Sequence, residues 1–211
     1  MMSHKTNSYI VYVIMNDNFF IVGVKKLREK ILKTAKELFI KNGYNATTTG
    51  DIVKYSGSSK GNLYYHFKIK ENLFLEILNI EDEKWFTRWR EEEKKCQSNR
   101  EKFYLLNELA IKMDDYYSMQ TAIIEFYSRE YESKDIEEKI KEIEQRYMDM
   151  YYDIFNAGNR ENEWHIKNIE SASQIVVATI HGIIMFSPMI DKKKRVELME
   201  QFSQIFLKGV E

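Results

Sequence analysis

The sequence predicts an all-α protein. Its 211 residues include only one proline, and few clusters of glycine, proline and asparagine interrupt the chain as they do between strands. Apolar residues recur three or four positions apart along most of its length, which is the spacing of a helix face. The hydrophobic fraction of 44% is enough for a sizeable core. We therefore expect about nine helices joined by short connections.

The first two dozen residues do not follow this pattern. The stretch "YIVYVIMNDNFFIVGV" is apolar, but the polar residues 16–18 interrupt it, so neither half is long enough to span a bilayer. Locally it predicts two short strands about a turn. We expect residues 1–24 to be an extension, and hypothesise that residues 1–23 are upstream sequence included by a misplaced start, with Val24 as the alternative start.

The next segment predicts a helix that ends near Asn42 and Gly43, a good C-terminal stop. Its apolar residues fall on one face: Leu27, Ile31, Ala35, Leu38 and Phe39.

Two shorter helices are expected to follow. Thr48 and Asp51 have the spacing of a capping box, which opens a helix with Ile52 and Val53 facing inward. After the tight turn "SGS", Ser59 can cap a third helix, whose apolar residues are Leu63 and Phe67. Three short helices with a glycine in the second connection form a helix-turn-helix pattern.

The charges divide the chain into two parts. Residues 25–70 contain eleven Lys or Arg and three acids, a balance of +8. Residues 1–24 balance to zero, so residues 71–211 carry −9 of the total of −1. We therefore predict two domains with different partners, over residues 25–70 and 71–211.

The third helix has the residue types of a DNA-recognition helix. Its N-terminus presents free amides to phosphate or base edges, and Gly61 lets the backbone approach closely. Lys60 can donate to guanine and Asn62 can pair with a base or phosphate, while the phosphate donors would be Tyr64, Tyr65 and His66. Residues 47–49 and Lys70 would hold the DNA backbone on either side. The alternative is a solvated helix face with its tyrosines half packed in a small core.

A long helix is predicted after Lys70, and further helices at about 99–112, 120–132, 134–160, 169–186 and 192–209. The last two differ from the others. "IVVATIHGIIMF" is apolar nearly all round, and a broad apolar stripe follows it on Val196, Met199, Phe202, Ile205 and Phe206. We expect both helices to meet a second copy of the chain.

The acidic part carries carboxylates next to aromatic residues. Glu81 and Asp82 share a helix face with Trp85, and Glu144 shares one with Tyr147. On the segments between lie Asp114, Tyr116, Tyr117 and Tyr127. Such a set suits a lipophilic cation, although spacing alone favours the alternative of solvated acids and core aromatics.

The stretch "ILKTAKELFIKNGYNATTTGDIVKYSGSSKGNLYYHFKIKENLFLEIL" resembles the DNA-binding domain of the tetracycline-repressor (TetR) family. The segments "NREKFY", "AIIEFY", "EIEQRY", "NEWH" and "FSQIFLKG" extend the resemblance to a multidrug-binding member of that family, over residues 25–209. The first 24 residues have no counterpart there.

The resemblance implies an all-helical homodimer that binds a palindromic operator and is released by a small molecule. It also implies a pair of dimers on each operator and control of a multidrug efflux pump. By carry-over, the DNA contacts come from Thr49, Ser58, Ser59, Lys60, Gly61, Asn62, Tyr64, Tyr65, His66 and Lys70. Ile69 departs from the capping Ser or Thr usual there, a loss of about 1 kcal/mol that operator binding should survive.

The resemblance also implies the ligand site. Six residues are of the same type as in the relative's drug site: Trp85, Tyr117, Gln120, Tyr127, Glu144 and Tyr147. The full expected set adds Glu81, Asp82, Asp114, Tyr116, Ile123, Ala178, His181 and Met185. Tyr116 and Tyr117 stand where two tyrosines leave the relative's pocket as drug enters.

Four residues depart from the relative's drug site. Ser118 replaces a proline, Ala178 and His181 replace asparagines, and Met185 replaces a threonine. A protonated His181 would repel a cation, so a different, non-cationic ligand remains the alternative.

Other classes of function find little support. The histidines, at positions 4, 66, 165 and 181, are scattered, and there is no Gly-rich phosphate loop or nucleophile motif, so we predict no metal, no cofactor and no enzymatic activity. An enzyme could still draw acid or base groups from Asp114, Glu144 and His181. A helical adaptor that dimerises without DNA leaves the +8 segment unexplained. The single cysteine, Cys96, fits a reducing cytoplasm, and no membrane partner is expected.

Overall fold

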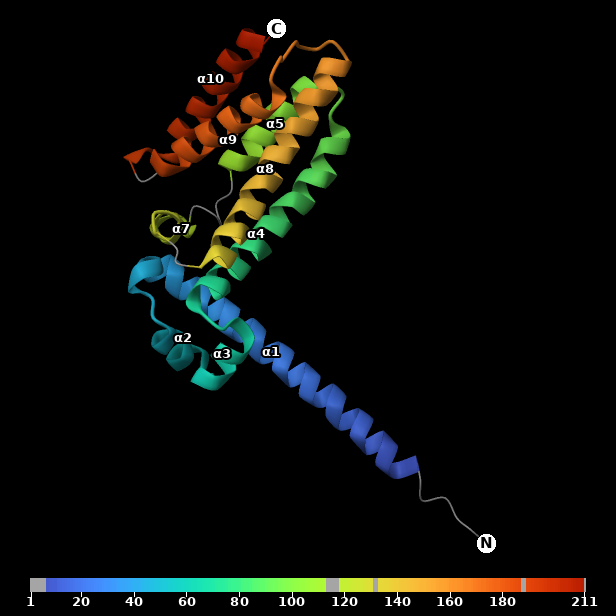
Figure 1. The fold of residues 1–211 in the computed structure, drawn as a ribbon, viewed down its shortest axis with the longest axis vertical. Coiled ribbons are helices and arrows are strands. Elements are labelled where there is room, and N and C mark those ends of the chain that lie inside the picture. Colours follow the sequence, from blue (N-terminus) through green and yellow to red (C-terminus); the bar gives the residue numbers. More distant parts are fainter. Residues whose placement is uncertain (1–6, 113–117, 131–132, 187–188, 211) are drawn as a thin grey trace. The chain divides into compact units, whose positions relative to one another are not determined.

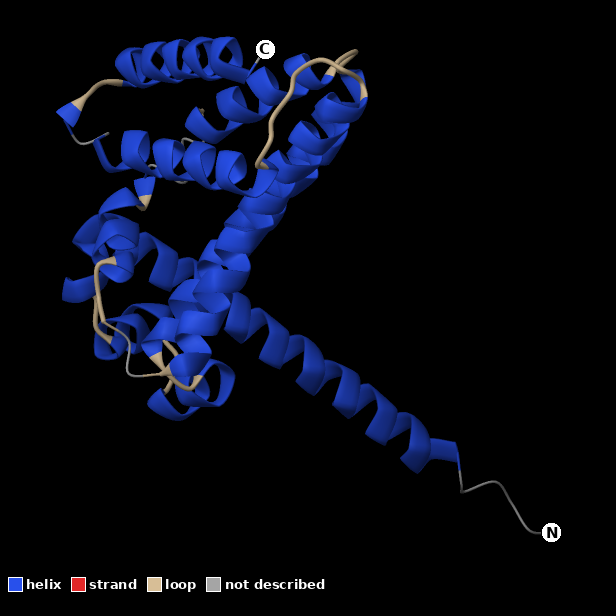
Figure 2. Cartoon of the chain, turned by 45° about the horizontal axis from the view of Figure 1, so that its top comes forward, coloured by secondary structure: helices blue, strands red, loops and turns tan. Residues whose placement is uncertain are grey.

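The computed structural model describes residues 7–112, 118–130, 133–186 and 189–210, with side chains from Lys25 onward. Within these ranges the chain consists of helices joined by loops and turns, without a β-strand (Figure 2). The prediction of an all-α fold is therefore confirmed. The chain forms two compact units, Met1–Phe74 and Leu75–Glu211.

The first unit contains α1 (Asn7–Ala46), α2 (Thr49–Ser56), α3 (Lys60–Phe67) and the first turn of α4 (Lys70–Glu92) (Figure 1). Gly43 interrupts α1 with φ 79° and ψ 176°, so the predicted stop at this glycine is confirmed. Only glycine takes such a backbone conformation without strain.

The start of α1 corrects the expectation of two strands at the N-terminus. The helix runs without a break from Asn7 through the residues predicted as strands. An isolated pair of strands is marginally stable in water, whereas each residue added to an existing helix gains a hydrogen bond at little cost. The interruption at residues 16–18 therefore does not produce a turn.

The core of the first unit is a small group of aromatic and aliphatic side chains. The ring of Phe74 lies edge-on to Phe39 and Tyr44, with centroids 4.9 and 5.0 Å away. Around these rings are buried Ile31, Ala35, Ile52, Leu63, Phe67 and Leu73. Leu63 and Phe67 thus hold α3 to α1 and α2, whereas the other residues of α3 are exposed except for the half-buried His66.

The second unit contains the remainder of α4, a short 3₁₀ helix (Glu93–Lys95), α5 (Asn99–Ile111), α7 (Gln120–Tyr127), α8 (Lys134–Arg160), α9 (Ile169–Phe186) and α10 (Lys192–Val210). α8 packs along α9, and α5 packs against both α8 and α10 (Figure 1). The helix predicted over 120–132 ends at Tyr127, where the Ser128 hydroxyl and backbone N–H both bond to the Ile124 carbonyl.

A close contact between α8 and the following loop fixes the end of α8. Trp164 is buried and donates from Nε1 to the Phe155 carbonyl at 2.9 Å. Its indole lies so close to Gly158 that a Cβ built there would be 2.2 Å from the ring. The position therefore admits only glycine.

α9 and α10 leave apolar side chains uncovered. In α9, Ile175, Met185 and Phe186 are exposed, and in α10 the side chain of Ile205 is 72% exposed. Among the described helices, α9 alone is long and apolar enough to cross a membrane, and a third of that window is buried in the protein. A helix at a subunit interface shows the same composition.

Candidate functional site

The start of α2 is built by the predicted capping box. The Thr48 hydroxyl accepts from the Asp51 backbone N–H at 3.1 Å, and Asp51 Oδ2 accepts from the Thr48 hydroxyl and backbone N–H. The hydroxyl hydrogen bond is the main cause that lowers the pKa of Asp51. Thr49, the predicted DNA contact, is exposed on the first turn beside this cap.

The turn between α2 and α3 is equally well defined. Gly57 ends α2 in the left-handed conformation with φ 64°, which favours glycine. Ser59 begins α3 and accepts from the Asn62 backbone N–H at 3.1 Å. Ser58 is half-buried, and its backbone N–H donates to the Val53 carbonyl at 3.2 Å.

The outer face of α3 carries the predicted recognition residues. Lys60, Gly61 and Asn62 are exposed, and Tyr64 and Tyr65 have 63% and 70% of their surface exposed. His66 is half-buried, with its ring edge-on to Tyr65 at 5.1 Å. We call the exposed residues Lys60, Gly61, Asn62, Tyr64 and Tyr65 the recognition face. Two adjacent tyrosines held in water are unusual unless they contact a partner.

No contact among the described residues explains why residue 61 is a glycine. It lies in the first turn of α3, where glycine is less favourable than alanine by up to about 1 kcal/mol. A Cβ built at Gly61 would meet nothing closer than the Ser59 hydroxyl at 3.8 Å. Packing within the described residues therefore gives no reason for the missing side chain at Gly61.

Lys70 differs from the other predicted DNA contacts. Its ammonium donates to the carbonyl oxygens of Tyr44 and Thr47, both at 2.9 Å. The same atom lies 4.1 Å from the centre of the Tyr44 ring. Two of its donors are thus used within the first unit.

Two cavities in the second unit share residues of α9. The first, about 40 Å³, is bounded by Trp85, Ala110, Tyr147, Tyr151, Val177, Ile180, His181 and Ile184. The second, about 100 Å³, is bounded by Ile123, Ile124, Tyr127, Glu144, His181, Ile184 and Met185. Drug-sized ligands occupy pockets of roughly 300 Å³ or more, so such a ligand would need these walls to move.

A buried carboxyl lies behind the first cavity. Tyr147 donates from its hydroxyl to Asp82 Oδ1 at 2.6 Å, and its ring packs 5.4 Å from that of Trp85. Burial raises the pKa of Asp82 to about 6, despite the hydrogen bond from Tyr147. Glu81 is also buried and forms an ion pair with Lys84 at 2.8 Å. The indole Nε1 of Trp85 is buried without a hydrogen-bond partner among the described residues.

His181 faces the carboxylate of the second cavity. Its Nε2 lies 3.6 Å from Glu144 Oε2, a distance that becomes an ion pair when the imidazole is protonated. The side chain belongs to both cavities, so any ligand that fills them must contact or displace it.

The other predicted ligand residues are placed differently. Gln120 is buried and donates from Nε2 to the Ile184 carbonyl, which ties α7 to α9. Ala178 is exposed on α9 and borders neither cavity. Asp114, Tyr116 and Tyr117 lie outside the described residues, so their predicted role is not placed.

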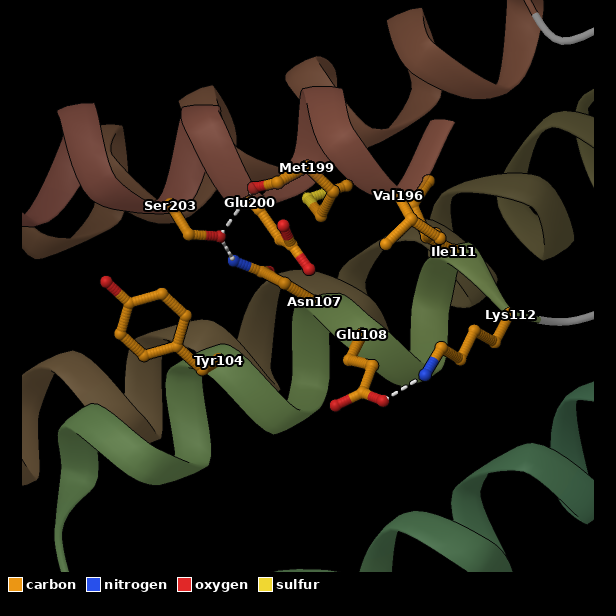
Figure 3. A pocket seen from close by; sticks show the side chains of 9 residues that line it. All are labelled: Tyr104, Asn107, Glu108, Ile111, Lys112, Val196, Met199, Glu200 and Ser203. Atoms are coloured by element: carbon orange, nitrogen blue, oxygen red, sulfur yellow. Dashed lines mark hydrogen bonds and ion pairs between the residues drawn. The ribbon is translucent and has the colours of Figure 1, made fainter. Parts of the chain in front are cut away.

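A third cavity, about 190 Å³ between α5 and α10, was not predicted (Figure 3). At its floor Asn107 and Ser203 point toward each other, with Asn107 Nδ2 donating to the Ser203 hydroxyl at 2.9 Å. Tyr151, a wall of the first cavity, donates to Asn107 Oδ1 at 2.7 Å. In the sequence these hydrogen-bonded residues are isolated polar positions, so their spacing does not predict that they meet. Among the described residues no three metal-ligating side chains come together.

Two family models match successive parts of the chain. Residues 31–77 match the model of bacterial regulatory proteins of the tetR family, and residues 81–211 match that of the QacR-like protein C-terminal region. The HTH-type transcriptional regulator QacR of Staphylococcus aureus is 55% identical over 184 residues, covering 87% of this chain and 98% of the relative.

The chain belongs to the TetR family. It is a transcriptional regulator of the helix-turn-helix type, as the resemblance in its sequence implied.

More distant relatives share the TetR fold. A putative TetR-family regulator from Syntrophomonas wolfei is 22% identical with a TM-score of 0.74, and the two chains overlap over 88% and 96% of their lengths. The regulator FadR of Bacillus subtilis, solved with stearoyl-CoA, is 21% identical with the same TM-score over 87% and 99%.

Proposed function

We propose that this TetR-family regulator is a repressor that binds a palindromic operator as a dimer and is released by a lipophilic cation. The recognition face supports the first part. Lys60 and Asn62 are exposed and can donate to base edges, and the N-terminus of α3 is directed to solvent beside them. Gly61, which nothing inside the protein requires, is the observation that carries the proposal.

Around this face, the hydroxyls of Tyr64, Tyr65 and Thr49 can donate hydrogen bonds to DNA phosphates. Ser58, Ser59 and His66 complete the proposed surface, with the Ser59 side chain occupied as a cap. The basic balance of residues 25–70 supplies the attraction to DNA.

Dimerisation through α9 and α10 is the second element of the proposal. The exposed Ile175, Met185, Phe186 and Ile205 would be covered by the same helices of a second copy. A two-fold dimer presents two recognition faces, which matches a palindromic operator. Binding of two such dimers to one operator is part of the proposal.

For the ligand, we propose a lipophilic cation bound at the joined cavities beside His181. Trp85, Tyr127 and Tyr147 offer aromatic faces, and Glu144 and Asp82 offer negative charge in a partly dry setting. With such a ligand, we propose that the regulated gene encodes a multidrug efflux pump. The regulator would act in the cytoplasm.

A non-cationic ligand is the second candidate. Glu144 already faces His181 at 3.6 Å, and the remaining lining of both cavities is largely apolar. When His181 is protonated, the pair is neutral and would favour an uncharged or anionic compound.

The DNA-binding part is tested by fluorescence anisotropy of a labelled duplex from upstream of the protein's own gene. Affinity should fall steeply as salt increases, because lysines displace counterions from the phosphates. Binding that ignores salt would contradict the proposal. Sedimentation of the free protein should show a dimer at all the same salt concentrations, since apolar burial is insensitive to screening.

A further inference from the structure

The third cavity, between α5 and α10, has no part in the proposed function. Ile111, Val196 and Met199 supply apolar surface to its lining, and Tyr104 adds an exposed aromatic ring (Figure 3). Its volume of about 190 Å³ exceeds that of either other cavity, but is smaller than the roughly 300 Å³ of a pocket for a drug-sized ligand. The cavity therefore suits a ligand smaller than a drug.

Buried hydrogen bonds fix the floor of this cavity. Asn107 and Ser203 are both buried, and the Ser203 hydroxyl, which accepts from Asn107, donates to the Met199 carbonyl at 2.8 Å. Tyr151, also buried, holds the Asn107 side chain from the other side through its hydroxyl. These bonds join α5, α8 and α10, so the floor is preformed and the cavity does not have to open before a ligand enters.

The charged residues of the lining leave one carboxylate uncompensated. Glu108 and Lys112, one turn apart on α5, form an ion pair (Figure 3). Glu200 projects from α10 toward α5, and it forms no ion pair with any residue in the described ranges. Two acids and one lysine give the lining a net charge of −1. A negative charge beside apolar and aromatic surface attracts an organic cation.

The cavity and the proposed dimer contact use different sides of α10. Met199 and Ser203 lie one turn apart and are buried on the side that faces α5. Ile205, the exposed residue proposed to meet the second copy, follows Met199 by six positions, which is roughly 240° further round the helix. We therefore expect the cavity to stay accessible in a dimer.

We propose that the third cavity is a second ligand site, which takes a small organic ammonium ion. The ammonium pairs with Glu200 and lies against the Tyr104 ring. The apolar part of the ligand contacts Ile111, Val196 and Met199. This site is separate from the two cavities proposed for a lipophilic cation, and it requires neither them nor binding to DNA.

Methionine-methyl NMR of the full chain tests the proposal, with benzylammonium as the probe. Met199 lines the third cavity and Met185 lines the second, so their labelled methyl signals report the two places separately. Met199→Leu and Met185→Leu assign these signals. Benzylammonium should shift the Met199 signal in a saturable way. A Met199 signal that stays in place, with or without a shift at Met185, would overturn the proposal.

Glu200→Gln tests the charge and should fold normally, because the residue is exposed. We expect benzylammonium to bind about fivefold more weakly, since an ion pair at the surface is lost. Glu197→Gln is the matched control on the same helix. Its carboxylate is already paired with Lys194 at 2.9 Å and does not line the cavity, so affinity should not change. Equal affinities of the wild type and Glu200→Gln would contradict the assignment.

Two further measurements separate charge from shape. Benzyl alcohol has the same ring without the charge, and it should bind about fivefold more weakly than benzylammonium to the wild type. Val196→Phe enlarges a side chain of the lining and should abolish the shift of the Met199 signal. Equal binding of the alcohol and the ammonium ion, or an undiminished shift in Val196→Phe, would reject an ammonium site in this cavity.

Discussion

The two candidate sites differ in how complete they are in the free protein. On the first unit, the recognition face is exposed, and the caps at Thr48 and Ser59 already fix both helices that present it. In the second unit, the aromatic and acidic residues are buried or half-buried around cavities of about 40 and 100 Å³. A surface that meets DNA can be finished in advance, whereas a pocket for a drug-sized ligand has to open.

The titratable groups show the same contrast. The pKa of Asp51 is lowered mainly by the hydrogen bond from the Thr48 hydroxyl, so its charged form stabilises the first unit. Asp82 is buried and its pKa is raised to about 6, so its charge destabilises the second unit. A charge that costs stability in the free protein is one that a bound cation can compensate.

The largest expected effect comes from filling the space beside Trp164. Gly158→Ala would place a Cβ 2.2 Å from the indole. We expect the free energy of unfolding to fall by about 3 kcal/mol or more, because neither the helix nor the buried ring can move easily. Urea unfolding measures this loss. Gly209→Ala is the control, since nothing lies within 4 Å of its Cβ. Equal effects of the two substitutions would refute the tight packing described for the second unit.

Asp82→Asn tests the cost of the buried charge. The pKa of Asp82 in the folded protein, about 6, lies above the ordinary aspartate value of 3.8, so the protonated form favours folding and stability is lost as pH rises from about 4 through 6. The variant should therefore be more stable than the wild type by about 3 kcal/mol near pH 7.5 and by little near pH 4. Urea unfolding at both pH values checks it. A variant less stable near pH 7.5 would show that Asp82 is not an uncompensated charge.

Lys60→Ala tests the recognition face. We expect operator affinity to fall by about ten- to a hundredfold and base preference to relax at one position of each half-site. The stability of the free protein should not change, because the side chain is exposed. Binding to a library of half-site variants measures both effects. An unchanged sequence profile would restrict Lys60 to a phosphate contact.

Gly61→Ala should move stability and DNA binding in opposite directions. Alanine is favoured over glycine in a helix by up to about 1 kcal/mol, and the Cβ would lie in ordinary contact with the Ser59 hydroxyl at 3.8 Å. The free protein should therefore gain stability while operator affinity falls. Thermal unfolding and anisotropy on one preparation give both numbers. Unchanged or tighter DNA binding would remove the main support for close approach at this residue.

The smallest expected effect is the pH dependence of ligand binding. A protonated His181 would pair with Glu144 and repel a cation, and Asp82, whose pKa is raised to about 6, loses its negative charge below that pH. Cationic dyes should bind severalfold more weakly near pH 5.5 than near pH 7.5. His181→Asn should reduce this difference and leave only the part due to Asp82. Identical pH profiles in the two proteins would rule out the role of His181.

Much of the fold follows from local sequence patterns. The capping box at Thr48, the cap at Ser59 and the stop at Gly43 depend only on residues within one turn, and the structure has all three. The prediction of two N-terminal strands was wrong because the short polar pattern at residues 16–18 does not reveal that the following helix extends back through it.

The sites were less predictable, since they depend on contacts between distant residues. The hydrogen bond from Lys70 to the Tyr44 carbonyl spans 26 positions, and the one from Asn107 to the Ser203 hydroxyl spans 96. Helical spacing gives the face on which Asp82 and Glu144 lie, but not the depth of burial or the approach of His181. The resemblance to the TetR family supplied residue types, and only the structure shows that Gln120 bonds to the backbone and that Ala178 is exposed.

The central claim is that a ligand in the second unit controls DNA binding by the first. The most direct measurement is the fluorescence anisotropy of the preformed complex with a labelled upstream duplex, titrated with the lipophilic dication dequalinium at fixed salt. We predict that the dication releases the DNA, and that release requires more of it in a variant with Glu144→Gln. A complex that persists at every dequalinium concentration, while the dye binds the free protein, would contradict the claim.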